Sequence, residues 1–190
     1  MEYHKSLMKI SLAENLRKLM QRHLFEKITI KQICDETGVI RATFYNYFSD
    51  KYDCLNWIIY HDIVENSKDD VANGEFEKAL TDSLQVLEEN KQFYRTAYHV
   101  TGQNSFEDMI RDNLRILVLQ FLERYRKEDY LSKYSNELLS RYIAESLAFN
   151  IRMFVNETGG AKTIEEHREM TLDLMKNSFF DFVNLKRIKD

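Results

Sequence analysis

The sequence contains no proline and only five glycines in 190 residues. Because these two residues interrupt helices and mark the tight turns of β-structure, their scarcity favours long helices over a strand-rich fold. Hydrophobic residues make up 44% of the chain, and its length suits one ordinary domain or a small domain joined to a larger one. We therefore predict an all-α protein with a proper core.

The sequence also lacks a long uninterrupted apolar run and a signal peptide. Its first residues, MEYHKSLMKISLAENL, have neither the apolar centre nor the small-residue cleavage site of such a peptide. Cys34 and Cys54 show no CxxC spacing and fall in apolar helical patterns, which favours buried thiols over a disulfide or a metal site. We expect a cytoplasmic protein without redox chemistry.

Motifs of catalysis and of cofactor binding are missing as well. The serines show no nucleophile-elbow spacing, and no glycine-rich phosphate loop occurs. His61 and Glu65 have i,i+4 spacing, but a metal site needs more ligands than this pair supplies. We predict that the protein is not an enzyme and has neither a cofactor nor a metal site.

Charge is distributed unevenly along the chain. The net charge of the whole chain is −4. Residues 1–55 hold nine lysines and arginines against seven aspartates and glutamates, a net charge of +2, so the remainder carries −6. A mildly basic N-terminal part on an acidic remainder is expected when only the first part meets a polyanion.

Hydrophobic spacing in the N-terminal region predicts a first helix. Apolar residues recur there at intervals of three and four, which favours an amphipathic helix over roughly residues 5–25. We expect Arg17, Lys18 and Arg22 on its polar side. The apolar positions are Leu12, Ala13, Leu16, Leu19, Met20 and Leu24.

Two short helices are expected next, separated by a glycine turn. Thr29 is placed to cap the first of them, and Gly38 can adopt the positive φ that ends it. The following helix must begin near Ile40. At about 100° per residue, Phe44 and Phe48 share its inward face. Its flanks and outward ridge are then occupied by Tyr45, Tyr47, Ala42, Thr43 and Asn46.

A short helix, a tight turn and a second helix with a polar outer ridge are typical of a helix-turn-helix. The second helix of this motif fits the major groove of DNA, where its side chains reach base edges. Tyrosine hydroxyls on both flanks, and Lys51 at the start of the next helix, suit the phosphates that border the groove. The spacing therefore predicts a DNA-reading unit near the N-terminus.

The segment ITIKQICDETGVIRATFYNYFSDKYDCL, residues 28–55, resembles the DNA-binding region of the TetR family of bacterial transcriptional regulators. Two positions depart from the family pattern: Ile40 replaces a capping serine, and Ala42 replaces a glycine. The loss of that N-cap is worth about 1 kcal/mol. The matching positions are Thr29, Ile33, Gly38, Val39, Thr43, Tyr45, Phe48 and Lys51.

The resemblance implies a helix-turn-helix DNA-binding domain over residues 1–52 and a helical effector-binding and dimerisation domain over residues 53–190. It also implies the role of individual residues at the DNA. Thr29 and Lys31 would meet phosphate, and Arg41, Ala42, Thr43 and Asn46 would approach bases. Tyr45, Tyr47 and Lys51 would hold the DNA backbone.

Two long apolar helical runs near the C-terminus are separated by Gly159 and Gly160, and Thr163 and Glu166 follow in capping-box spacing. In the TetR family the last two helices build a four-helix dimer interface, so the resemblance implies a homodimer. The alternative is that both apolar stripes are intramolecular core. The predicted interface residues are Ile143, Leu147, Ile151, Phe154, Leu174 and Phe179.

Aromatic residues in the C-terminal part are candidates for an effector cavity, although aromatics at helical spacing also serve as plain core. Without a dense basic cluster in this acidic part, a mostly apolar or aromatic effector fits better than a phosphorylated one. The candidate residues are Trp57, Phe93, Tyr94, Tyr98 and Phe121.

The resemblance implies a homodimeric regulator, most often a repressor in this family, that binds a palindromic operator and is released by an effector. A second hypothesis is an activator whose C-terminal part binds a protein co-regulator. The stretches TFYNYF, NWII and NKQFY are similar to regulators of dihydroxyacetone kinase operons, which act in that way. A closed apolar cavity would favour the first hypothesis, and an exposed apolar patch outside the dimer interface the second.

Overall fold

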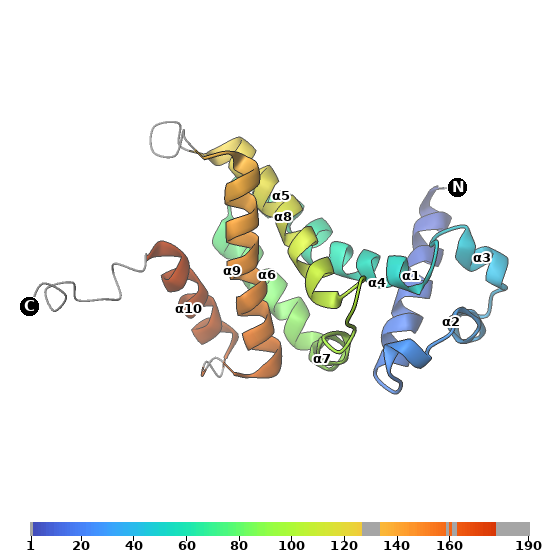
Figure 1. Cartoon of the computed structure of the whole chain (residues 1–190). Coiled ribbons are helices and arrows are strands. Elements are labelled where there is room, and N and C mark those ends of the chain that lie inside the picture. Colours follow the sequence, from blue (N-terminus) through green and yellow to red (C-terminus); the bar gives the residue numbers. More distant parts are fainter. Residues whose placement is uncertain (1, 127–133, 159, 161–162, 178–190) are drawn as a thin grey trace, which may run out of the picture.

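The computed structural model describes residues 2–126, 134–158, 160 and 163–177 (Figure 1). Over these residues the chain forms helices and connecting turns without a strand, which confirms the predicted all-α fold. An N-terminal head packs beside a larger helical body, and one long helical run joins them (Figure 1). Within the same residues, no helix is long and apolar enough to cross a membrane.

The head contains helices α1 (Glu2–Met20), α2 (Ile30–Thr37) and α3 (Arg41–Tyr45), with a short 3-10 turn, η1 (Phe25–Lys27), after α1. Helix α1 ends earlier than the predicted residue 25. Backbone N–H groups of Arg22 and His23 both donate to the carbonyl of Leu19 and close the helix there. Phe25 then enters the core, and Leu24 is 57% exposed, because the turn reverses the chain before the apolar pattern reaches it.

Arg17 is the second departure from the expected first helix. We predicted it on the polar side, but its side chain is buried. Helix α1 packs against α4 and α7 as well as α2, so the face that carries Arg17 lies at the junction with the body. Hydrophobic spacing did not indicate that this second face of α1 is also covered, because the residue buried there, Arg17, is charged.

Helix α4 (Lys51–Ile59), the π-helical segment η2 (Tyr60–Glu65) and helix α5 (Asn66–Asn73) form the run that joins head and body. The side chain of Asp50 caps its start by accepting from the N–H of Asp53. Gly74 ends it with φ 80°, a left-handed conformation that favours glycine. The run spans the expected position of the domain boundary without a break.

The body adds helices α6 (Phe76–Glu89), α7 (Lys91–Ala97), α8 (Phe106–Tyr125), α9 (Asn136–Asn156) and α10 (Ile164–Lys176). Helix α9 packs along α8, and α10 packs against α6 (Figure 1). The predicted capping box of Thr163 and Glu166 is present at the start of α10, and the side chain of Ser105 caps α8. Cys34 and Cys54 are buried free thiols.

Candidate nucleic-acid interface

The turn between α2 and α3 has the geometry that the sequence predicts. Thr29 and Gln32 form a reciprocal capping box, in which the N–H of Gln32 donates to the Thr29 hydroxyl and the N–H of Thr29 donates to the Gln32 side chain. Gly38 follows α2 with φ 74°. The N–H of Val39 donates to the Cys34 carbonyl at 3.0 Å, so the turn closes with its backbone groups paired.

Helix α3 shows the predicted division between an inward and an outward face. Phe44 and Phe48 are 0% and 2% exposed, and their ring centroids lie 5.6 Å apart. Tyr45 is 56% exposed, and Tyr47 is half-buried. On the outward side Arg41, Ala42 and Asn46 are exposed and Thr43 is half-buried. The structure thus brings the predicted base-reading residues together on one ridge.

The start of α3 lacks a side-chain cap, as the substitution of isoleucine for a capping serine predicts. Ile40 occupies the N-cap position without a side-chain hydrogen bond and is 71% exposed. An apolar side chain that prominent at the edge of the ridge suits contact with the sugars or the thymine methyl groups of a DNA groove. The family pattern, with serine there, did not indicate this residue.

Thr29 and Lys31 lie at the start of α2, where helix N–H groups favour an anion. Lys31 pairs with Asp35 at 2.6 Å, and both side chains are more than half exposed. An exposed ion pair of this kind contributes little to stability, so phosphate can compete for the lysine. The predicted phosphate contacts of both residues remain predictions.

Lys51 has a different environment from the one we predicted. Its ammonium group donates to the backbone carbonyls of Phe25, Glu26 and Ile28 at 2.8, 3.2 and 2.9 Å. Partial burial lowers the pKa of Lys51 despite the nearby carboxylates of Glu26 and Asp50. Because an ammonium group has three N–H donors, these three bonds leave none free for a phosphate. In the chain without DNA, Lys51 therefore holds the η1 turn, and its predicted contact with the DNA backbone remains a prediction.

The five predicted effector residues do not line one cavity. Trp57 packs between Phe48 and His61 at the head, with ring centroids 6.0 and 5.0 Å away. Phe93 and Tyr94 are fully buried core. Tyr98 and Phe121 border two separate hollows in the body surface. Aromatic content did not identify a pocket because most of these rings pack against one another.

The apolar space in the body includes the groove that Phe121 borders. A cavity of about 50 Å³ lies between η2, α5, α6, α8, α9 and α10, and its wall includes Ile63, Leu84 and Leu117. A more open groove of about 330 Å³ adjoins it, with Val71, Phe76, Leu117 and Leu147 lining both. Aliphatic residues dominate this lining, so aromatic clusters in the sequence do not indicate it.

The predicted dimer stripe on α9 is largely covered within the single chain. Leu147, Ile151 and Phe154 are 6%, 9% and 7% exposed, and Ile143 is half-buried, because they pack within the protomer. Leu174 on α10 is 41% exposed, and Phe179 lies outside the described residues. Periodicity located the apolar stripe correctly but did not show that the protomer itself covers it.

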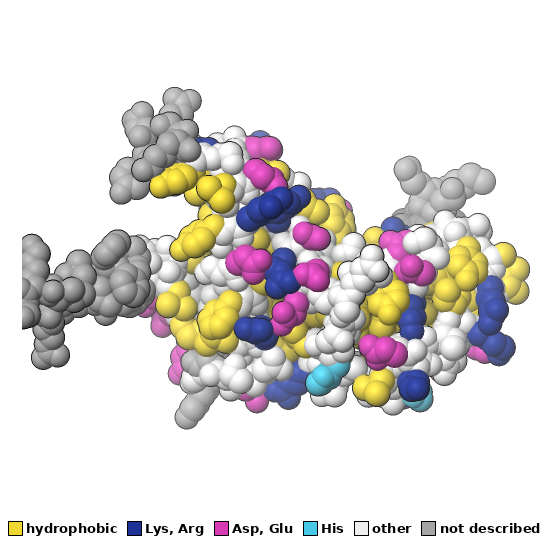
Figure 2. All heavy atoms as spheres, viewed as in Figure 1, with side chains coloured by type: hydrophobic (Ala, Val, Ile, Leu, Met, Phe, Trp, Pro, Cys, Tyr) yellow, Lys and Arg dark blue, Asp and Glu magenta, His cyan; other side chains and the backbone are white. Residues whose placement is uncertain are grey.

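A second set of apolar residues on α9 is exposed instead. Leu138, Tyr142 and Phe149 are 53%, 75% and 49% exposed. Figure 2 shows hydrophobic side chains along α9 and toward α10, beside paired charges between α8 and α9. Two of these pairs join Arg115 to Glu137 and Arg152 to Glu107, at 2.9 and 3.0 Å. We name Leu138, Tyr142 and Phe149 the outer face of α9.

Comparisons with known proteins agree with the helix-turn-helix geometry. The family profile described as "Bacterial regulatory proteins, tetR family" matches residues 14–58. The profile described as "Transcriptional regulator C-terminal region" matches residues 74–177, more than half of the chain.

Individual relatives point the same way. The chain is 27% identical over 138 residues to the "HTH-type dhaKLM operon transcriptional activator DhaS" of Lactococcus lactis subsp. lactis, covering 72% of this chain and 73% of that protein. A solved structure of the dihydroxyacetone kinase operon activator DhaS superposes with a TM-score of 0.59 and 21% identity, covering 88% of this chain and 93% of the other.

A structure of a TetR-family regulator from Syntrophomonas wolfei superposes with a TM-score of 0.68 and 19% identity, covering 90% of this chain and 94% of the other. These two structures support the fold, and the two family profiles between them cover the head and the body. This chain belongs to the TetR family of bacterial transcriptional regulators.

Proposed function

We propose that the protein binds a palindromic operator as a homodimer and that α3 reads the bases in each half-site. The observation that carries this proposal is the outward ridge of α3. Arg41, Ala42, Thr43 and Asn46 are accessible there, while Phe44 and Phe48 anchor the opposite face. Lysine and arginine side chains gather at the end of the head away from the body, over α2 and α3 (Figure 2). That placement suits a negatively charged duplex.

Dimerisation would place two such ridges on one face of the DNA. A head of this size reads only a few base pairs. In a dimer, binding of one head to its half-site raises the effective concentration of the other head at the second half-site. The outer face of α9 is the surface that supports pairing of two copies best, because its apolar side chains remain exposed in the single chain. We propose that it replaces the buried stripe as the dimer contact.

The test is binding of the full-length protein to operators selected from a random pool of duplexes. Selection should recover an inverted repeat whose half-sites lie about one helical turn, 34–36 Å, apart. Asn46→Ala should relax base preference and cost about 1–3 kcal/mol on the selected site, with little change on random DNA. Equal loss on both kinds of DNA, or recovery of a sequence without symmetry, would contradict the proposal.

The body could control operator binding in two ways. In the first, a small apolar effector enters the space between η2, α5, α6, α8, α9 and α10 and releases a repressor from DNA; the aliphatic cavity wall supports this mode. The second candidate is an activator that binds a protein co-regulator through its body. The relative from Lactococcus lactis, described as a transcriptional activator, favours this second mode.

A reporter gene behind the selected operator distinguishes the two modes. A repressor lowers expression until an effector is added, whereas an activator raises expression when its partner is present. A thermal-shift screen of the purified protein with apolar and anionic small molecules adds a direct reading, because a ligand that binds the folded state stabilises it more as the ligand concentration rises. Stabilisation only by a second protein would assign the body to the co-regulator mode.

A further inference from the structure

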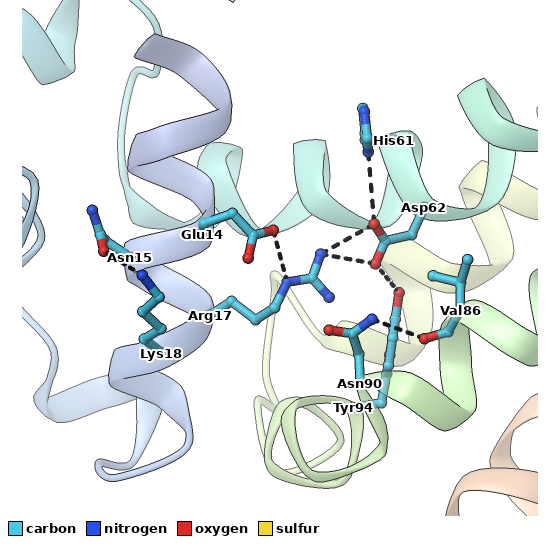
Figure 3. A network of polar contacts seen from close by, with 9 residues as sticks. All are labelled: Glu14, Asn15, Arg17, Lys18, His61, Asp62, Val86, Asn90 and Tyr94. Atoms are coloured by element: carbon cyan, nitrogen blue, oxygen red, sulfur yellow. Dashed lines mark hydrogen bonds and ion pairs between the residues drawn. The ribbon is translucent and has the colours of Figure 1, made fainter. Parts of the chain in front are cut away.

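A buried polar cluster joins the head to the body (Figure 3). Nη2 of Arg17 donates to Oδ1 and Oδ2 of Asp62 at 3.1 and 3.0 Å, and the hydroxyl of Tyr94 donates to Oδ2 at 2.5 Å. The three residues are 6%, 5% and 0% exposed. Arg17 comes from α1 of the head, Asp62 from the π-helical segment η2, and Tyr94 from α7 of the body. We name these three residues the junction cluster.

The protonation states of the junction cluster are set by its members together with the neighbouring His61. Burial works to raise the pKa of Asp62, but His61, Arg17 and Tyr94 together outweigh it and hold that pKa below its usual value. Burial, reinforced by the carboxylate, raises the pKa of Tyr94, so the phenol keeps its proton and donates. The cluster is therefore an ion pair with a neutral donor, and each bond has a defined direction.

Stability alone does not account for this arrangement. Desolvation of a buried ion pair offsets most of its Coulomb attraction, and apolar residues of similar volume often serve as well. Nη1 of Arg17 is also buried and has no hydrogen-bond partner among the described residues. The three hydrogen bonds instead fix the position of the head relative to the body, because all three form together in only one placement of head against body.

The carboxylate of this cluster lies on an unusual stretch of helix. Segment η2 has π-helical turns, which are rare and are commonly found at functional sites. Asp62 points to the head, while the next residue, Ile63, lines the apolar cavity of the body. A change of backbone register within η2 would therefore move a residue of the cavity wall and a residue of the junction cluster together.

Helix α7, which carries Tyr94, also contacts the end of α9. On the same helix, Nε of Arg95 donates to the carbonyl of Val155 at 2.8 Å, and Lys91 pairs with Glu157 at 3.1 Å. Glu157 ends α9 with φ 56°. The junction cluster thus lies between the head, the cavity wall and the helix that carries the proposed dimer contact.

We propose that Asp62, held between Arg17 and Tyr94, is the positioning residue that sets the orientation of the DNA-reading head against the body, and that η2 is where a change in the body alters it. This inference rests on the proposed function, since head orientation matters only if two heads read paired half-sites. In a dimer, tilting both heads changes the distance between the α3 ridges. The cluster therefore determines which half-site spacing the protein accepts.

The experiment measures affinity for a set of selected operators whose half-site spacing is changed by one or two base pairs in either direction. Two junction variants are compared with the parent: Asp62→Asn, which keeps shape and removes charge, and the double variant Arg17→Met with Asp62→Leu, which replaces the ion pair by apolar groups. We expect discrimination between the best and the altered spacings to fall about fivefold or more in both. The double variant should retain the thermal stability of the parent more closely than Asp62→Asn does.

Val118→Ala is the matched control, because it removes buried packing in α8 away from the junction cluster. It should lower thermal stability and leave the preferred spacing unchanged. If a junction variant unfolds at the assay temperature, Tyr94→Phe provides the same reading with one hydroxyl removed. Folded junction variants that keep the spacing discrimination of the parent would overturn the inference.

The parent protein separates this inference from the proposed function. A parent that binds a symmetric operator with a sharp spacing optimum upholds the proposed function, whatever the junction variants then do. A parent that selects no symmetric operator overturns the proposed function, and this inference with it.

Discussion

The head and the body are both helical, but they fill their interiors in different ways. In the head, aromatic rings contact one another directly: the centroids of Phe25 and Tyr52 lie 4.9 Å apart, and those of Phe44 and Phe48 lie 5.6 Å apart. The body also has rings in contact, such as Tyr98 and Phe106 with centroids 4.9 Å apart, but it additionally borders an aliphatic cavity of about 50 Å³ with a groove of about 330 Å³ beside it. Close packing resists deformation, so the head suits rigid reading of DNA and the body suits a change of shape.

Substitutions on the two faces of α9, the covered stripe and the outer face, are expected to have the largest effects on stability and dimerisation. Leu147→Glu places a carboxylate in the core of the body, and we expect it to destabilise the fold by roughly 5 kcal/mol or more, from lost packing and an unpaired buried charge. Tyr142→Glu changes a side chain that is 75% exposed, so the protein should stay folded but become monomeric. Circular dichroism and light scattering measure the two outcomes. A dimeric Tyr142→Glu variant would move the dimer contact away from the outer face of α9.

Phe44→Ala tests the close packing of the head. The ring is fully buried on the inward side of α3, so its removal should leave a cavity and cost about 3–5 kcal/mol. Operator affinity should fall because the head loosens, while the dimer mass is unchanged. Chemical denaturation followed by binding assays checks this. A variant as stable as the parent that nevertheless loses operator binding would mean that Phe44 faces the DNA.

Lys51→Met distinguishes a structural lysine from a phosphate contact. Loss of three charged hydrogen bonds to the η1 carbonyls should lower stability by about 1–3 kcal/mol. The slope of log K against log salt should stay that of the parent, because no phosphate contact is removed. If the slope falls by about one unit while stability holds, Lys51 contacts DNA in the complex. Lys31→Met is the comparison variant, and its slope should fall by about one unit.

The smallest effect on stability is expected from replacing two buried alanines, one in the body and one in the head, by valine. Ala79 lines the cavity of the body and Ala13 lies in the close-packed head, and both are buried in helices. Ala13→Val should destabilise by about 1–3 kcal/mol through overpacking. Ala79→Val should be neutral or stabilise by up to about 1 kcal/mol, because its added methyl groups enter empty space. Thermal denaturation compares them directly, and equal losses at both positions would remove the contrast between head and body.

Local sequence was a sufficient guide wherever a helix end or a short turn decides the structure. The caps at Thr29 and Thr163 and the left-handed turn at Gly38 are present as predicted. The inward pair Phe44 and Phe48 and the outward ridge of α3 also agree, because a helix of this length has only one face to bury. The DNA roles of the ridge residues remain predictions.

Long-range packing decided what periodicity left open. The stripe containing Leu147 and Phe154 was correctly identified as apolar, but contacts with other helices of the protomer cover it and leave Tyr142 and Phe149 outside. Arg17 was expected in solvent because charge is the usual mark of a polar face. A partner 45 positions away, Asp62, makes its burial tolerable, and no local pattern indicates such a partner.

The sequence by itself determined that this protein is helical, where the DNA-reading helix begins, and which side of that helix faces inward, since each follows from backbone geometry and neighbours within a few residues. Only the tertiary structure decided which charged groups are buried, which apolar stripe is covered, where the cavity lies and how the head is held against the body. Those features depend on contacts between helices far apart in the chain, and the same local pattern is compatible with several such packings.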